Sequence, residues 1–175
     1  MVIKQLSEIT KEYYKNGLID ENFVMNAVTN TLGGETTKAS KYDDIKNHID
    51  FWWNSPRMGL LGVDVKGLNK NKRDDKSYDD TIHWLELQNV NGGDGWLKGK
   101  ADYIAFKTMS KILFEKRNKL LEFTEKQIEG KDIVYETPKE CYVPYQRKKW
   151  GREDIALKAL NSDLEKLAQF CIDYN

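Results

Sequence analysis

The segment from His48 to Lys66, HIDFWWNSPRMGLLGVDVK, constrains the fold more than any other part of the chain. It contains two stretches of alternating apolar and polar residues, separated by a run with Asn, Ser, Pro and Gly. Successive side chains of a strand point to opposite faces, so each stretch predicts a strand with one apolar face. The apolar positions are Ile49, Phe51 and Trp53 in the first stretch and Leu61, Val63 and Val65 in the second. We expect a hairpin whose apolar faces share one core.

The polar face of this hairpin carries two acids and a lysine. The turn permits two registers, and in one of them Asp50 lies opposite Asp64 while His48 lies opposite Lys66. Directly opposed residues have Cβ atoms about 4.5–5.5 Å apart, and two carboxylates at that separation repel each other. A divalent cation explains the pairing, because Mg²⁺ binds through one or two carboxylates and keeps several waters. The hairpin therefore predicts a magnesium site.

Asp50, followed after a short gap by Asp64-Val65-Lys66, resembles the signature of the PD-(D/E)XK nuclease superfamily. That superfamily includes restriction endonucleases, archaeal Holliday-junction resolvases and many phage nucleases. The resemblance covers roughly residues 20–106, the expected catalytic core. Ile49 stands where proline gives the family its name, and Asp64 stands where glutamate is commoner. The resemblance implies a restriction-endonuclease-like fold and a nuclease dependent on Mg²⁺, for which Mn²⁺ can substitute.

The resemblance also implies a role for each residue of the hairpin face. Asp50 and Asp64 are expected to hold the metal. Lys66 is expected to position and polarise the attacking water, or to stabilise the charge that develops on the phosphate. His48 either contacts phosphate or orients a water, or it is a partly buried histidine of the sheet.

Many family members carry a further acid on a helix, and Glu21 is the candidate here. It lies at helical spacing from Val24 and Val28, which places its carboxylate on the stripe that faces the sheet. Glu21 has an alternative role, which is to complement the helix dipole in the first turn. Glu12 is the second candidate, on a more polar face.

Glu86 and Gln88 repeat the polar spacing on a later predicted strand. Glu86 is expected to add a metal ligand, directly or through water, and Gln88 to hold the attacking water or a phosphate oxygen. In a competing alignment Asp64 is the first acid and Glu86-Leu87-Gln88 supplies the second half of the motif, with glutamine in place of lysine. The first alignment is preferred because it keeps the lysine, and both alignments predict the same patch.

The net charge limits the kind of nucleic-acid-binding protein that this chain can be. The 28 basic residues balance the 28 acidic ones, which argues against a protein that coats nucleic acid and leaves room for a local basic groove. Two basic clusters are candidates for contacts with the DNA backbone. Their members are Lys70, Lys72, Arg73 and Lys76, and Arg147, Lys148, Lys149 and Arg152.

The remaining chain predicts alternating helices and strands. Helices are expected over 3–16 (closed by Gly17), 20–32 and 118–128, with one helical turn over 41–47. Ser162 and Glu165 form a capping box for a last helix, whose apolar stripe runs from Leu164 to Cys171. Strands are expected over 35–40, 83–90, 96–106 and 110–115, the second and third as a hairpin, and irregular chain over 67–80 and 131–149.

Length and composition favour one domain over residues 1–175, with a nuclease-like core and an extension over 107–175. The order of elements predicts an α/β (α+β) fold with a mixed central sheet flanked by helices. Without an apolar run near 18 residues or a signal-peptide core at MVIKQLSEIT, we expect no membrane span and a cytoplasmic location. Cys141 and Cys171 lack the spacing of a zinc site and are expected to be small buried residues.

The sequence thus predicts a metal-dependent endonuclease that hydrolyses phosphodiester bonds of DNA. By resemblance, DNA is the partner, a homodimer is allowed so that two sites meet two strands, and a phage or other viral origin with action in the host cytoplasm is compatible. Two alternatives stay open: a non-catalytic nucleic-acid-binding protein of the same fold, and a structural domain whose acids decorate the surface.

Overall fold

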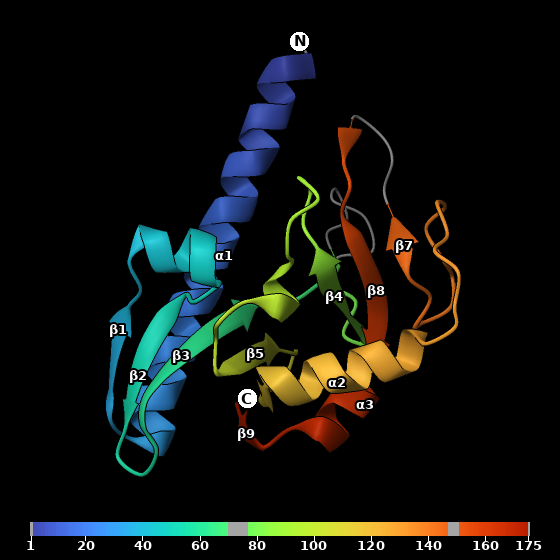
Figure 1. Cartoon of the computed structure of the whole chain (residues 1–175). Helices are drawn as coiled ribbons and strands as arrows, with labels where there is room; N and C mark the ends of the chain where they lie inside the picture. Colours follow the sequence, from blue (N-terminus) through green and yellow to red (C-terminus); the bar gives the residue numbers. More distant parts are fainter. Residues whose placement is uncertain (1, 70–76, 147–150, 175) are drawn as a thin grey trace.

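The computed structural model describes residues 2–69, 77–146 and 151–174. Its centre is a six-stranded sheet with the order β1-β2-β3-β5-β6-β9 (Figure 1). The strands are β1 (Glu35–Lys38), β2 (Phe51–Ser55), β3 (Gly59–Lys66), β5 (Tyr103–Lys107), β6 (Lys111–Lys116) and β9 (Phe170–Asp173). All neighbours run antiparallel except β3 and β5, which run parallel. The prediction of a mixed α/β protein with a mixed central sheet is therefore confirmed.

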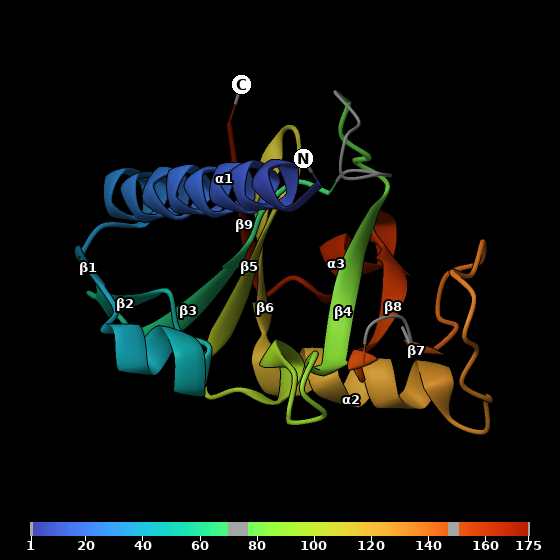
Figure 2. The ribbon, with the colours of Figure 1, turned by 90° about the horizontal axis from the view of Figure 1, so that it is seen from above.

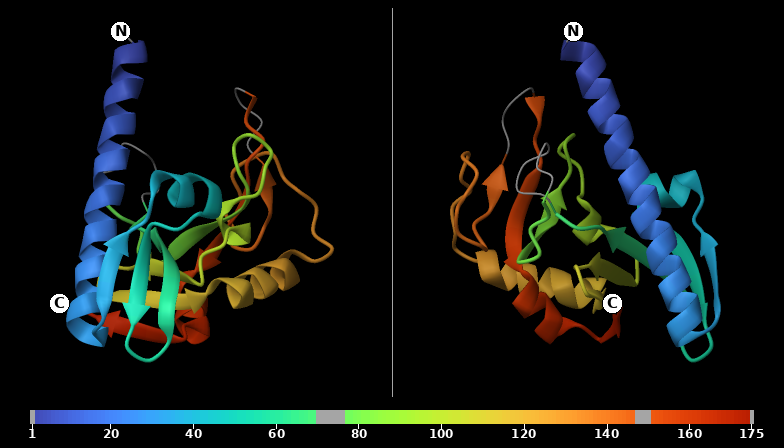
Figure 3. Two further views of the ribbon diagram at one scale, coloured as in Figure 1. Left: turned by 60° about the vertical axis from the view of Figure 1, so that its left-hand side comes forward. Right: turned by 180° about the vertical axis from the view of Figure 1, so that it is seen from behind.

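A second, smaller sheet and several helices complete the fold. The second sheet has the order β4-β8-β7, with β4 (Ile82–Gln88), β8 (Ile155–Leu160) and β7 (Tyr145–Gln146). The helices are α1 (Val2–Leu32), α2 (Arg117–Ile128) and α3 (Asn161–Leu167), with single turns at Asp43–Asn47 and Trp96–Lys98. The N-terminal half of α1 extends past the edge of the six-stranded sheet (Figure 3).

Both faces of the six-stranded sheet are covered, and each has its own core. Helix α1 lies across one face (Figure 2), where Val24 and Val28 pack with Phe51, Trp53 and Val63. The other face packs against β4, β8, α2 and α3. That second core includes Ile104, Leu85, Leu157, Leu120 and Leu164. Of the polar residues on the second face of the hairpin, Asp64 is therefore buried, Asp50 and Lys66 are half-buried, and Asn54 near the turn is exposed.

The predicted hairpin forms, in the register that would set the two acids opposite each other if it continued past Phe51. Phe51 pairs with Val63 and Trp53 with Leu61, because both strands bury their apolar alternation against α1. Ile49 is the exception, since it packs in the second core. Strand β2 begins only at Phe51, and His48 has a left-handed backbone with φ 53°. The predicted alternation therefore fails at Ile49, which faces the opposite core from Phe51 and Trp53.

Three predicted helix boundaries are wrong. The two N-terminal helices are one, since α1 continues through Gly17. The capping box at Ser162 is absent, because α3 begins at Asn161 with Leu160 as an N-cap that makes no side-chain hydrogen bond. The last helix also ends at Leu167, and exposed Cys171 belongs to β9. The apolar residues have helical spacing, but hydrogen bonding of β9 to β6 keeps this segment extended.

The predicted hairpin of 83–90 with 96–106 is also wrong. Strand β4 pairs with β8, which the sequence reading missed, and β5 pairs with β3 and β6. The glycine-rich turn is followed by the helical turn Trp96–Lys98, which carries the chain from one sheet to the other. The strands over 35–38 and 111–116 and the helix over 117–128 are confirmed.

Gly17→Ala is expected to stabilise the protein by roughly 0.5–1 kcal/mol, because glycine in a helix interior costs that much relative to alanine. A Cβ at Gly17 has no neighbour within 4 Å. Urea unfolding of the two proteins measures the difference. Gly34→Ala is the matched control with the opposite expectation, since its φ is +85° and its Cβ would lie 2.2 Å from the backbone oxygen of Asn54. A destabilised Gly17→Ala variant would contradict an unbroken α1.

Candidate functional site

The two predicted metal acids meet where β2 begins and β3 ends. The amide of Asp50 donates to the carbonyl of Val63 at 2.9 Å. Val63 is also the partner of Phe51, so two residues of one strand face one residue of the other, as in a β-bulge. The amide of Val65 donates to Asp50 Oδ2 at 2.6 Å and fixes that carboxylate over β3. The pairing of β2 with β3 ends at Phe51 and Val63. Asp50 approaches Asp64 through its carboxylate, whose charge raises the pKa of Asp64.

Asp64 is the most deeply buried member of the site. Its exposed fraction is 3%, and its Oδ1 accepts a hydrogen bond from Lys66 Nζ at 2.8 Å. Its Oδ2 is buried and has no hydrogen-bond partner among the described residues. A buried carboxylate oxygen without a partner is costly, and a proton or a bound cation would remove that cost.

Lys66 is held between an acid and an aromatic ring. Its Nζ lies 4.6 Å from the ring centroid of Trp96, a distance at which a cation is attracted to the π face. Burial lowers the pKa of Lys66, but the charges of Asp64 and Asp50 outweigh burial and leave that pKa raised. Lys66 is therefore a cation at neutral pH.

For Asp64, in contrast to Lys66, burial outweighs the effect of the neighbouring opposite charge on the pKa. Burial raises its pKa well above the usual value; Lys66 opposes this shift and the charge of Asp50 adds to it. A like charge nearby and burial both disfavour the ionised form of a carboxyl group. Lys66 supplies one positive charge for the two acids.

Glu21 reaches the same site from α1. It forms an ion pair with Lys38 of β1 at 2.7 Å. Burial raises the pKa of Glu21, and the nearby charges of Asp50 and Asp44 raise it further. The alternative role in a first helical turn is wrong, because α1 begins at Val2. Glu12, the second candidate, is in α1, and its side chain lies outside the described part.

Two residues of the site were missed by the sequence reading. Lys38 pairs with Glu21, and Asp44 lies in the helical turn before the hairpin. Burial raises the pKa of Asp44, and the charge of Asp50 raises it further, so the two acids are neighbours. No local pattern marks either residue, because each reaches the site only through the packing of β1 and this turn against β2.

His48 also belongs to the site and not to a strand. Burial lowers its pKa, and the positive charge of Lys66 lowers it further. Its left-handed backbone packs against Gly99, where an added Cβ would lie 2.8 Å from His48 Cβ. The interpretation of His48 as an ordinary sheet histidine is therefore wrong.

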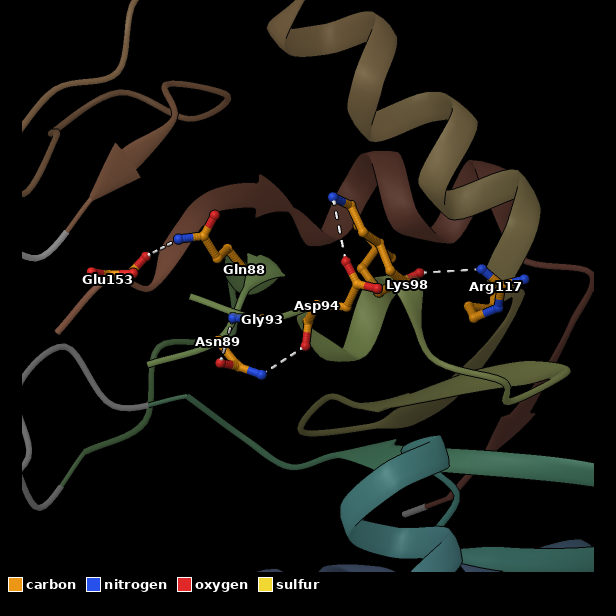
Figure 4. Close-up of polar contacts among 8 residues, drawn as sticks. Gln88, Asn89, Gly93, Asp94, Lys98, Arg117 and Glu153 are labelled. Carbon is orange, nitrogen blue, oxygen red and sulfur yellow. Dashed lines mark hydrogen bonds and ion pairs between the residues drawn. The ribbon is translucent and has the colours of Figure 1, made fainter. Parts of the chain in front are cut away.

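Glu86 and Gln88, both on β4, have different partners. Burial raises the pKa of Glu86 while the charge of Lys66 lowers it, so Glu86 faces the site from β4. Gln88 instead donates from Nε2 to the carbonyl of Glu153 at 2.7 Å (Figure 4). Because β4 belongs to the second sheet, the alignment that pairs Asp64 with Glu86-Leu87-Gln88 lacks adjacent strands.

Of the predicted nucleic-acid contacts, Arg152 is the one that falls on described chain. Its Nε lies 3.2 Å from Asp154 Oδ1, and its charge lowers the pKa of Glu86, which brings it to the rim of the site. The others lie outside the described residues: Lys70, Lys72, Arg73, Lys76, Arg147, Lys148 and Lys149.

The candidate metal ligands of the site are the two carboxylates of Asp50 and Asp64. Over residues 2–69, 77–146 and 151–174, no group of three or more His, Cys, Asp or Glu side chains is arranged to hold a metal ion. Mg²⁺ needs only one or two protein carboxylates and takes its other ligands from water. The donor set of Asp50 and Asp64, with an unpartnered Oδ2, therefore fits Mg²⁺ better than a metal that requires a closed protein cage.

Within the same described ranges, no helix has the length and apolar character needed to cross a bilayer. Comparisons of the chain with protein-family models, with curated proteins and with solved structures gave no match.

Proposed function

We propose that this protein is a metal-dependent nuclease that hydrolyses phosphodiester bonds of DNA, with a PD-(D/E)XK-like centre formed by Asp50, Asp64 and Lys66. One observation carries the proposal: Oδ2 of Asp64 is buried and unpartnered, in a carboxylate that lies near Asp50 and accepts a hydrogen bond from Lys66. Lys66 compensates Oδ1 of Asp64, whereas a purely structural role leaves the buried Oδ2 without a partner. The mixed sheet with helices on both sides is compatible with the fold that this family has.

Asp50 and Asp64 are the proposed ligands of Mg²⁺, with Glu86 as an outer ligand through water. When bound, the cation would lower the pKa of a water nucleophile and neutralise charge on the scissile phosphate. Asp50 is preorganised for this role by the amide of Val65. Mn²⁺ prefers the same oxygen donors and is the proposed substitute.

Lys66 is proposed to stabilise charge on the phosphate and not to act as a base. Its raised pKa keeps the side chain protonated at neutral pH. The Trp96 ring and Asp64 hold Nζ in place before substrate binds, and preorganised charge is the most effective way to stabilise a developing oxyanion. Glu21 is proposed to position the site through Lys38 and Asp50.

DNA is the proposed substrate by family resemblance, with basic side chains holding its backbone. Arg152 at the rim is the described member of this set. Such contacts position a duplex without reading its sequence. A dimer that presents two sites to two strands belongs to the same proposal.

Lys66→Met is expected to lower the rate of Mg²⁺-dependent cleavage about a hundredfold or more, the usual cost of removing one preorganised charge donor. Nicking and linearisation of supercoiled plasmid, followed by gel electrophoresis with Mg²⁺ and again with EDTA, measures the rate. Lys126→Met, an exposed lysine of α2, is the matched control. Wild-type cleavage that persists in EDTA would contradict metal dependence.

The same cleavage experiment, with gel shifts added, distinguishes the nuclease from a non-catalytic DNA-binding protein of the same fold. A protein that binds plasmid, linear and branched DNA in gel shifts without cutting any of them in Mg²⁺ or Mn²⁺ is a binding module of this fold. The lysine and both acids of the site favour the enzyme, because binding alone has no use for a buried acid pair that repels phosphate.

A further inference from the structure

A cavity of about 490 Å³ lies at the opposite end of β3 from the acids. It is bounded by the turn between β2 and β3, by the segment before β5 and by the start of α2. Its lining includes Met58, Leu61, Lys100, Asp102, Lys116 and Arg117. Leu61 precedes Asp64 by three residues, about 10 Å along a strand, so the cavity is separate from the candidate site.

The lining has an excess of positive charge. It holds three cations, Lys100, Lys116 and Arg117, and one carboxylate, Asp102. Asp102 Oδ2 already accepts the amide of Gly62 at 2.7 Å. In a chain whose net charge is zero, this local excess favours an anionic ligand.

The three cations differ in how firmly they are held. Arg117 donates from Nε to the carbonyl of Ala101 at 3.1 Å and from Nη1 to that of Leu97 at 3.3 Å, which fixes the guanidinium without neutralising it. Lys100 and Lys116 form no ion pair within the described ranges. A preset guanidinium beside two exposed ammonium groups suits a phosphate.

The opposite wall is apolar. Met58 is 46% exposed, and its sulfur lies 3.8 Å from the hydroxyl of Tyr103, which donates to it. Leu61 is half-buried beside it. A thioether and an aliphatic side chain give a soft surface against which a flat ring can lie.

We propose that this cavity binds a nucleotide, with its phosphate on Lys100, Lys116 and Arg117 and its base against Met58 and Leu61. A volume of this size lies in the range of small-molecule sites, about 300–1,000 Å³. A free nucleotide and a nucleotide within a DNA strand share this chemistry. The proposal uses none of the acids of the candidate site and does not depend on cleavage.

The test is an NMR titration of the full chain in EDTA with dTMP, inorganic phosphate and a single-stranded dodecanucleotide, so that hydrolysis plays no part. We expect saturable shifts at the amides of Met58, Lys100 and Arg117. The double variant Lys100→Gln/Lys116→Gln is expected to bind dTMP at least about tenfold more weakly, as for the loss of one charged contact. Lys119→Gln/Lys126→Gln, on the outer surface of α2, removes the same charge outside the lining.

Saturable shifts with dTMP support a free-nucleotide site, and shifts at the same amides with the oligonucleotide alone support a site for a DNA strand. Absence of saturable shifts at these amides with both ligands overturns the proposal. So does equal weakening by the two double variants. Inorganic phosphate that binds as tightly as dTMP overturns the base contact. Loss of plasmid cleavage leaves all of these outcomes unchanged, so the two proposals fail separately.

Discussion

Asp64→Asn is expected to lower Mg²⁺-dependent DNA cleavage at least about a thousandfold. The substitution keeps the shape of the side chain and removes the charge that lies near Asp50 and Lys66. A bound metal contributes several kcal/mol of transition-state stabilisation, and about 1.4 kcal/mol is a factor of ten in rate. Single-turnover cleavage of plasmid DNA measures the effect.

Thermal unfolding with and without Mg²⁺ gives a readout that does not need activity. Wild-type protein should gain about 2.7 kcal/mol at a hundredfold excess over its dissociation constant, and Asp64→Asn should lose most of that gain. Asp173→Asn, an exposed acid on β9 of the same sheet, is the matched control. If Mg²⁺ stabilises Asp64→Asn as much as the wild type, Asp64 is not a ligand.

The second large effect concerns stability and pH, at Glu115 of β6. This side chain is 1% exposed, and its Oε1 has no hydrogen-bond partner among the described residues. Burial raises its pKa to about 8. Glu115 pairs with Ile104, which in turn pairs with Asp64, so it lies on the same face two strands away from the candidate site.

The sign follows from protonation in the two states. Well below pH 4.5 the carboxyl is protonated in both the folded and the unfolded state, and its contribution is fully present. As pH rises from about 4.5 to about 8, the unfolded chain ionises first, so the folded state loses up to about 5 kcal/mol from this group. Glu115→Gln cannot ionise and should abolish that loss.

Urea unfolding at pH 5 and pH 8 compares the two proteins. We expect the stability of Glu115→Gln to fall less between these pH values than that of the wild type, by a few kcal/mol. Buried His83, whose pKa is lowered by burial, contributes equally to both proteins and cancels. Glu122→Gln, an exposed acid of α2, should keep the wild-type pH dependence. Equal pH slopes for Glu115→Gln and the wild type would contradict a protonated Glu115.

Short-range pattern was enough to find part of the centre of the candidate site. The hairpin and the shared face of Asp64 and Lys66 follow from an alternation of period two, which each strand carries in its own residues. The alternation left two registers open and fails at Ile49, so packing decided the register and the place of Asp50. Glu21 was also found, because the helical stripe with Val24 and Val28 records which side faces the sheet. These features depend on neighbours a few residues apart.

Only the tertiary structure decided which distant segments join them. Strands β4 and β5 fall in the two segments that were expected to form one hairpin, yet they lie in different sheets. Glu86 therefore approaches Lys66 from across the core, while Gln88 donates to the carbonyl of Glu153. Trp96, Lys38 and Asp44 contact the site from segments that pair or pack elsewhere. Local residue patterns record the direction of a side chain, whereas the partner of a strand is set by burial and hydrogen bonding summed over the whole chain.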